Sequence, residues 1–286
     1  MVSRLEALAR SEPTRLVLSP GSSWLALLIP KIALSAGFTL AGTTAVERLG
    51  PRLGGLVASV PQLAVVSLIF FALEQGLGFA AESAFWSIPG MCATLTVFLG
   101  YLVGSELVPA PRPASIATGV ALGTACFALA AALLSVTPLN RWSVIPMAAG
   151  ACFGTTWILR RLPDTAPLQR VAASPWLYAI RAGTSVVTVL TVTGLAHLLG
   201  PKWSGLMVGY PVNSLPVMVI LHSHYGRDVI KSFIKIFPAG IFGVCLFNLV
   251  AWLSLERLGL SLTIGLGYAV DIAYLGMIAW VRGRAR

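Results

Sequence analysis

A single carboxylate lies near the middle of the last apolar stretch of the chain. Asp271 has Tyr268 one helical turn before it and Tyr274 one turn after it. Because an ionised carboxylate is costly in hydrocarbon, we expect it to face the interior of a helix bundle, to stay protonated, or to pair with a cation such as Arg181 or Lys31. An acid in such a place can bind and release a proton or a sodium ion. We predict an ion-coupling role for Asp271, with Tyr268 beside it; the alternative is a structural ion pair between helices.

Two other apolar stretches each carry a cation followed by hydroxyl side chains. In the first stretch four residues recur at every fourth position and therefore share one helical face: Lys31, Ser35, Thr39 and Thr43. The second stretch repeats this face and widens it: Arg181, Ser185 and Thr193, with Thr184, Thr188 and Thr191. Such a face is typical of a polar lining for a negatively charged molecule. The alternatives are that the hydroxyls bond their own helix carbonyls and that the cations extend to the lipid headgroups.

These stretches belong to a longer repeat with a step of 150 residues. Its most distinctive part occurs twice: Leu49-Gly50-Pro51-Arg52, Gly55-Leu56 and Pro61, then Leu199-Gly200-Pro201-Lys202, Gly205-Leu206 and Pro211. The same step relates Lys31 to Arg181 and Glu106 to Glu256, and no gap is needed. A colinear series of matches indicates duplication, so we interpret the chain as two related halves.

The repeated prolines predict interrupted helices. Gly-Pro ends one helix and begins the next, and Pro61 and Pro211 then break a helix interior and release a backbone carbonyl. Polar backbone inside a membrane persists where it faces protein or a water-filled cavity. We therefore assign Pro61, Gln62, Pro211 and Asn213 to a substrate site near the midplane. The alternative is that glycine and proline only allow close packing and kinks.

The composition is that of a membrane protein. The 286 residues are 57% hydrophobic and 10% charged, with a mean hydropathy of +0.85. The net charge of +10 comes from short basic clusters between apolar runs, which favours a cationic cytoplasmic face over nucleic-acid binding. The four cysteines lie singly in apolar segments and are interpreted as core residues. Motifs for nucleotide, dinucleotide, zinc or nucleophile chemistry are absent, so we expect neither an enzyme nor a cofactor.

The spacing of the apolar runs predicts an all-α polytopic membrane protein with about nine transmembrane helices. The expected spans are 22–45, 53–73, 79–104, 113–136, 142–159, 175–198, 203–221, 229–253 and 259–281. They form two inverted-topology repeats of four helices joined by a linking helix. The expected parts are an interfacial amphipathic N-terminal segment (1–21), repeat 1 (22–136), a linking helix and loop (137–174) and repeat 2 (175–286).

Basic residues predict the orientation. More Lys and Arg lie on the side that includes Arg227, Lys231 and Lys235 than on the other side. The positive-inside rule then puts the C-terminus in the cytoplasm and the N-terminus outside, in a cell inner membrane. The wealth of Ala, Leu and Arg with few Lys favours a bacterial source.

At the level of class, this layout resembles inverted-repeat secondary transporters. The pattern Gly-Pro-Lys/Arg, Gly-Leu and Pro is also similar to small uncharacterised bacterial membrane proteins that carry one such unit. The first resemblance implies alternating access around a midplane site. We predict a secondary active transporter of a small anionic or carboxylate-bearing metabolite, coupled to a proton or sodium ion. The alternatives are a passive channel built on the same repeats and a non-transporting membrane scaffold or assembly protein.

The predicted partners are the lipid bilayer, the substrate and the coupling ion, with no nucleic acid; homo-oligomer formation is left open. The predicted substrate-binding residues are Lys31, Ser35, Thr39, Pro61, Gln62, Arg181, Ser185, Thr188, Pro211 and Asn213. No metal site is expected.

Overall fold

The computed structural model describes residues 27–41, 44, 61–162, 175–235 and 237–284. Within these residues the chain is all-helical, which confirms the predicted class at this level. The interfacial segment predicted for 1–21, the first copy of the Gly-Pro stretch before Pro61, and Thr43 lie outside the described residues.

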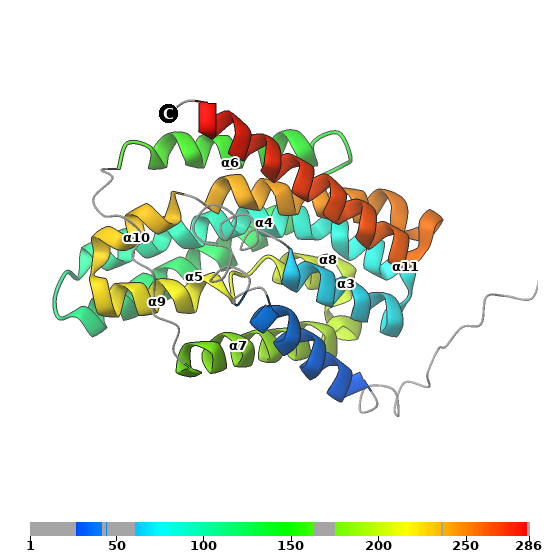
Figure 1. Ribbon diagram of the computed structural model, residues 1–286, viewed down its shortest axis with the longest axis horizontal. Coiled ribbons are helices and arrows are strands. Elements are labelled where there is room, and N and C mark those ends of the chain that lie inside the picture. Colours follow the sequence, from blue (N-terminus) through cyan, green and yellow to red (C-terminus); the bar gives the residue numbers. More distant parts are fainter. Residues whose placement is uncertain (1–26, 42–43, 45–60, 163–174, 236, 285–286) are drawn as a thin grey trace, which may run out of the picture.

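Figure 1 shows the helices coloured in their order along the chain. After a helix at Leu27–Ala41 come α3 (Gln62–Gln75), α4 (Leu77–Leu107), α5 (Arg112–Val136), α6 (Val144–Leu159), α7 (Pro175–Gly194), α8 (Ala196–Val208), α9 (Ser214–Tyr225), α10 (Arg227–Ile234) and α11 (Phe237–Arg284). The long helix α4 lies at the centre and contacts α3, α5, α6, α8 and α11.

Two glycines divide helices that are otherwise continuous. Gly200 inside α8 has φ 70°, and Gly259 inside α11 has φ 72°, a conformation that side chains with a Cβ rarely adopt. The Gly200 kink confirms that the second Gly-Pro stretch separates two helical segments. The Gly259 kink falls at the predicted boundary between the last two spans, and the two halves of α11 fold back on each other (Figure 1).

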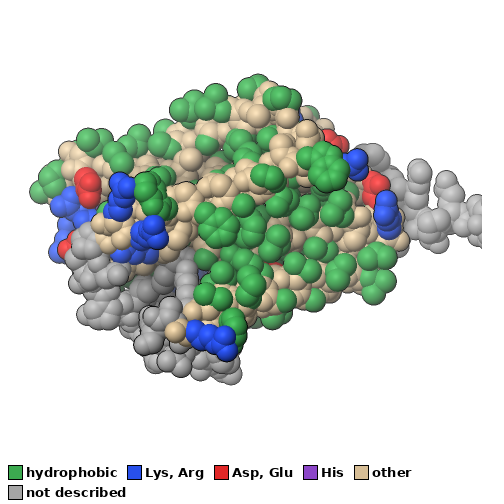
Figure 2. All heavy atoms as spheres, turned by 90° about the horizontal axis from the view of Figure 1, so that it is seen from above, with side chains coloured by type: hydrophobic (Ala, Val, Ile, Leu, Met, Phe, Trp, Pro, Cys, Tyr) green, Lys and Arg blue, Asp and Glu red, His purple; other side chains and the backbone are tan. Residues whose placement is uncertain are grey.

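The surface is that of a membrane protein. Among the described residues, three helical stretches are long and apolar enough to cross a bilayer: Leu77–Leu107, Arg112–Val136 and Arg227–Val281. Shorter apolar helices are Leu27–Ala41, Gln62–Gln75 and Val144–Leu159. Figure 2 shows a broad apolar surface with charged side chains gathered at its two ends. Large exposed side chains such as Leu129, Phe153 and Trp280 contribute to this surface.

The predicted seventh span, 203–221, is not one helix. α8 ends at Val208 and α9 begins at Ser214, so the residues between them form a break inside the bundle. The break includes Pro211, as predicted, but the interruption already starts two residues before it. This is the part of the fold that brings non-helical backbone against α4.

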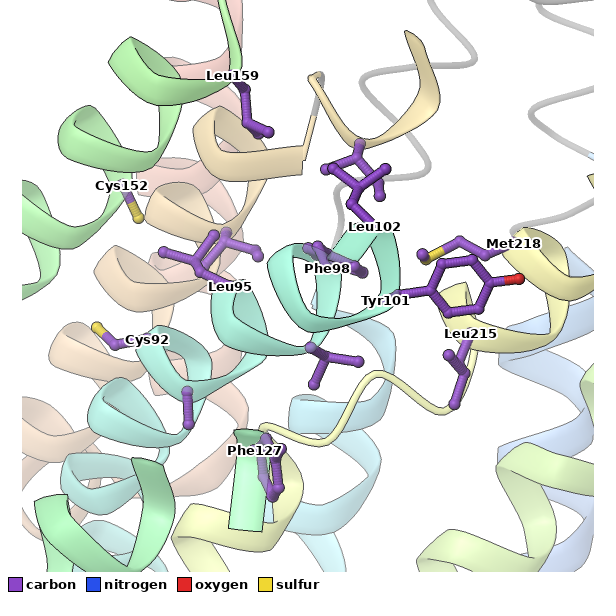
Figure 3. Close-up of a cluster of buried hydrophobic side chains, with 14 of the residues drawn as sticks. Cys92, Leu95, Phe98, Tyr101, Leu102, Phe127, Cys152, Leu159, Leu215 and Met218 are labelled. Atoms are coloured by element: carbon purple, nitrogen blue, oxygen red, sulfur yellow. The ribbon is translucent and has the colours of Figure 1, made fainter. Parts of the chain in front are cut away.

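Aromatic and aliphatic side chains of α4 fill the largest core cluster. Phe98 and Tyr101 are fully buried, and Figure 3 shows Tyr101 beside Leu215 and Met218 of α9. Cys92 and Cys152 are also buried in this cluster, which agrees with their interpretation as core residues.

Glycines allow α4 and α8 to pack backbone against backbone. A Cβ at Gly90 of α4 would lie 2.6 Å from the carbonyl oxygen of Leu206. A Cβ at Gly205 would overlap the carbonyl oxygen of Ser83, and a Cβ at Gly209 would overlap the backbone of Gly90. These contacts fix the break between α8 and α9 against the middle of α4.

We expect Gly90→Ala to destabilise the fold, because the new methyl group has no room beside the α8 backbone; overpacking of this kind costs about 1–3 kcal/mol. The measurement is the apparent Tm of the purified protein in detergent. Gly154→Ala in α6 is the matched control, since nothing lies within 4 Å of a Cβ at that position. Equal Tm values for the two variants would show that the α4–α8 contact is not tight.

Candidate functional site

Asp271 lies in the second half of α11, and its side chain is completely buried. Its Oδ1 atom occupies the space that a Cβ on Gly243, in the first half of α11, would need. Aromatic rings surround this contact: Tyr274 packs on Phe242, with ring centroids 5.5 Å apart. The expectation that Asp271 faces the interior of the bundle is therefore confirmed.

The carboxyl group of Asp271 has no polar partner in the described part of the chain. Neither of its oxygens accepts or donates a hydrogen bond there, and it forms no ion pair. An ionised carboxylate without a partner is very costly away from water. The surroundings therefore favour the neutral, protonated acid in this conformation.

Lys31 pairs with a residue that the sequence did not single out. Its Nζ lies 2.6 Å from Oε1 of Glu74, near the end of α3, and both side chains are almost fully buried. The same Nζ lies 5.6 Å from the centre of the Phe70 ring. The suggested pairing of Lys31 with Asp271 is wrong, because the Lys31 ammonium group forms its ion pair with Glu74 instead. The sequence feature that could have identified this partner is the position of Glu74, an acidic residue near the end of an apolar run.

The polar residues predicted to share a helical face are buried or partly buried in the structure. Lys31, Ser35 and Thr39 are each at least 96% buried. On α7, Ser185 and Thr193 are buried on one face, while Arg181 and Thr188 are partly buried.

Several of the hydroxyl groups on these faces donate to carbonyl oxygens of their own helices. Ser35 donates to the carbonyl oxygen of Lys31 at 2.6 Å, and Thr188 donates to that of Thr184 at 3.0 Å. Thr193 does the same with Val189 at 2.7 Å. In this conformation these bonds agree with the alternative that the hydroxyl groups bond carbonyl oxygens of their own helices.

The break between α8 and α9 is held by side chains from neighbouring helices. The hydroxyl of Thr94 in α4 donates to the carbonyl oxygen of Gly209, and the hydroxyls of Thr124 and Tyr210 lie 2.9 Å apart. Pro211 is buried, and Oδ1 of Asn213 is buried without a hydrogen bond to any described residue. The carbonyl of Gly209, two residues before Pro211, therefore has a side-chain partner from α4.

The predicted residues form separate groups. The helix at Leu27–Ala41 and α7 both pack on α3, where Val66 and Phe70 meet Leu34 and Val189. Pro61 precedes α3 and is buried, and Gln62 begins it. The break that contains Pro211 packs against α4 and α5. Asp271 and Tyr268 lie between the two halves of α11, where Tyr268 packs on Phe247.

A small polar gap lies where α3, α4, α8 and α11 meet. Its empty space totals about 160 Å³ and is too narrow for a water molecule. The polar side chains that line it are Ser67, Ser83, Ser87 and Asn248, and the apolar ones are Ala64, Leu68, Phe71, Ala84 and Val208. Sequence reasoning missed this set, because isolated uncharged residues show no spacing that marks them.

A basic cluster lies at one end of the bundle. Arg227 donates to the carbonyl oxygen of Ser105 at 3.4 Å, and Lys231 lies 3.7 Å from Glu106. Close by, Nδ1 of the buried His222 lies 3.1 Å from the hydroxyl of Tyr101. Burial, reinforced by Arg227, lowers the pKa of His222, so its ring is neutral at pH 7.

No metal centre is found in the described part of the chain, where no three His, Cys, Asp or Glu side chains are arranged to hold an ion. Comparison with models of known protein families, with curated proteins and with solved structures gives no match.

We expect Glu74→Gln to lower stability by about 3–5 kcal/mol, because it leaves the Lys31 ammonium buried without its counter-charge. The double variant Lys31→Met with Glu74→Met should recover most of this loss, since it removes both charges. Thermal unfolding of Lys31→Met, Glu74→Met and the double variant in detergent measures the coupling. Additive losses would show that the two side chains do not interact.

Proposed function

We propose that this chain is a secondary active transporter of the cell inner membrane. It moves a small anionic or carboxylate-bearing metabolite by alternating access, coupled to a proton or sodium ion through Asp271. The observation that carries this proposal is the complete burial of Asp271 without a hydrogen-bond or ion-pair partner among the residues that the structure describes. Acids inside membrane helices are expensive and typically mark ion or substrate pathways.

The helix boundaries support a duplicated architecture. Gly76 (φ 94°) separates α3 from α4, and Gly226 (φ 85°), 150 positions later, separates α9 from α10. The helix at Leu27–Ala41 corresponds by the same step to α7, and the linking helix α6 lies between the two copies. With one linking span between copies of four spans, the second copy would be inverted, as in many secondary transporters.

The two cations support a negatively charged substrate. Lys31 and Arg181 occupy equivalent positions in the two halves, on helices that both pack on α3. In this conformation Glu74 holds Lys31, so a substrate carboxylate would have to replace the Glu74 carboxylate at the ammonium group. The substrate would then take over an interaction that the resting protein makes with itself.

The surroundings of Asp271 favour a proton over sodium. Sodium sites in transporters are built from several oxygen ligands, including carbonyls of unwound helices. The described surroundings of Asp271 are Gly243, whose Cβ position its Oδ1 occupies, the Tyr274 ring beside that position, and Tyr268. A proton needs no coordination shell and can be carried by the carboxyl group alone.

The orientation with a cytoplasmic C-terminus is part of the proposal. Arg112, Arg227 and Lys231 gather at one end of the bundle, and this end would face the cytoplasm. A channel on the same repeats would pass substrate only down its gradient. A scaffold would use the helices for packing alone and would have no need for a buried acid that lacks a partner in the described part of the chain.

We expect Asp271→Asn to lose at least tenfold in ion-driven uptake while retaining its fold, because the amide cannot carry a proton. The measurement is uptake of radiolabelled short carboxylates into proteoliposomes, with an imposed pH gradient or sodium gradient. Glu82→Gln, which neutralises an exposed carboxyl on α4, is the matched control and should transport normally. Uphill accumulation by Asp271→Asn equal to that of the parent protein would overturn the coupling role, and flux without any accumulation in the parent would indicate a channel.

A further inference from the structure

The polar gap among α3, α4, α8 and α11 contains hydroxyl groups that lack the usual intrahelical bond. Ser87 donates to the carbonyl oxygen of Ser83 at 2.9 Å, and Ser254 donates to that of Val250 at 2.7 Å. By contrast, the hydroxyl oxygens of Ser67 and Ser83 have no hydrogen-bond partner among the described residues, although both side chains are 99% buried. A buried hydroxyl left unsatisfied costs about 1–3 kcal/mol. Two such groups therefore meet at one small gap.

Both halves of the chain contribute to this gap. Ser67 lies on α3 and Ser83 on α4, whereas Asn248 lies on α11 and Val208 on α8. Ser204 is another buried hydroxyl without a described partner, and it lies one helical turn before Val208. Unsatisfied polar groups thus gather where the helices of the two halves cross.

The gap also lies next to the break between α8 and α9. Val208 is the last residue of α8, and the break that contains Pro211 follows it directly. The last two turns of α8 therefore lie between two non-helical points, Gly200 and this break. Opening of the gap would require these turns to separate from α4, against which they pack at Gly90 and Gly205.

We propose that this gap is the closed form of a substrate-binding site, and that it takes the oxygen atoms of a small carboxylate. This inference rests on the proposed transport function and names the contacts at its centre. The hydroxyls of Ser67 and Ser83 can donate to carboxylate oxygens, and the described residues that line the gap include no acidic side chain to repel an anion. These described lining residues carry no formal charge, so a carboxylate in the gap would be held by neutral donors and released again. The gap would therefore be a contact separate from the Lys31 ammonium group, which pairs with Glu74 outside it.

Cysteine accessibility tests this site without a transport assay. The four native cysteines are replaced by serine or alanine, and Ser67→Cys or Ser83→Cys is introduced singly. The probe is the membrane-impermeant anion 2-sulfonatoethyl methanethiosulfonate, applied to the full chain in proteoliposomes and followed by intact mass. The matched control keeps only Cys245, which is fully buried in the core between α4 and α11.

We expect both introduced cysteines to react at least tenfold faster than Cys245, because the gap opens to water during the cycle. Acetate, lactate or succinate at millimolar concentration should slow the reaction severalfold at these positions. Reaction no faster than at Cys245, in protein with a normal elution profile and Tm, would overturn the site. Fast reaction that none of the carboxylates slows would overturn the substrate class.

The outcome separates this inference from the proposed function. Labelling and carboxylate protection need no ion gradient, so they would persist in a protein that does not accumulate substrate. Uphill transport that survives together with unreactive Ser67→Cys and Ser83→Cys would refute the site alone.

Discussion

The close approach of α4 and α8 is the constraint on which the rest of the structure depends. Lipid offers no hydrogen bonds, so the backbone released between α8 and α9 must be satisfied by the protein itself. Gly90, Gly205 and Gly209 remove the side chains that would keep the two backbones apart, and Thr94 then reaches the carbonyl oxygen of Gly209. With larger residues at these positions, the break would lie exposed and the crossing of the helices would be lost.

The buried polar groups of this bundle differ in how their charge or hydrogen-bonding capacity is satisfied. Lys31 and Glu74 neutralise each other, and most serine and threonine hydroxyls bond a carbonyl of their own helix. A few groups, among them Asp271 and the hydroxyls of Ser67 and Ser83, have neither solution among the described residues. Because each such group costs free energy, the proposed coupling and binding roles are built on them.

Much of the fold could be predicted from hydropathy and repeat spacing. The long apolar runs that became α4 and α5 and the turn at Gly259 follow from composition and from glycine, and the burial of Asp271 follows from the cost of a charge in hydrocarbon. The partner of Lys31 could not be predicted, since it depends on how α3 packs on the first helix. The gap could not be predicted either, because serines of α3 and α4 and an asparagine of α11 come together only where these helices cross.

The narrowness of the central gap has a bearing on the cell's energy supply. In the proposed transporter, a gap with no room for a water molecule would also have no room for hydronium or a hydrated ion. Many copies would then not drain the proton-motive force at this point. The throughput of each copy would be set by how often the helices separate rather than by how fast solutes diffuse.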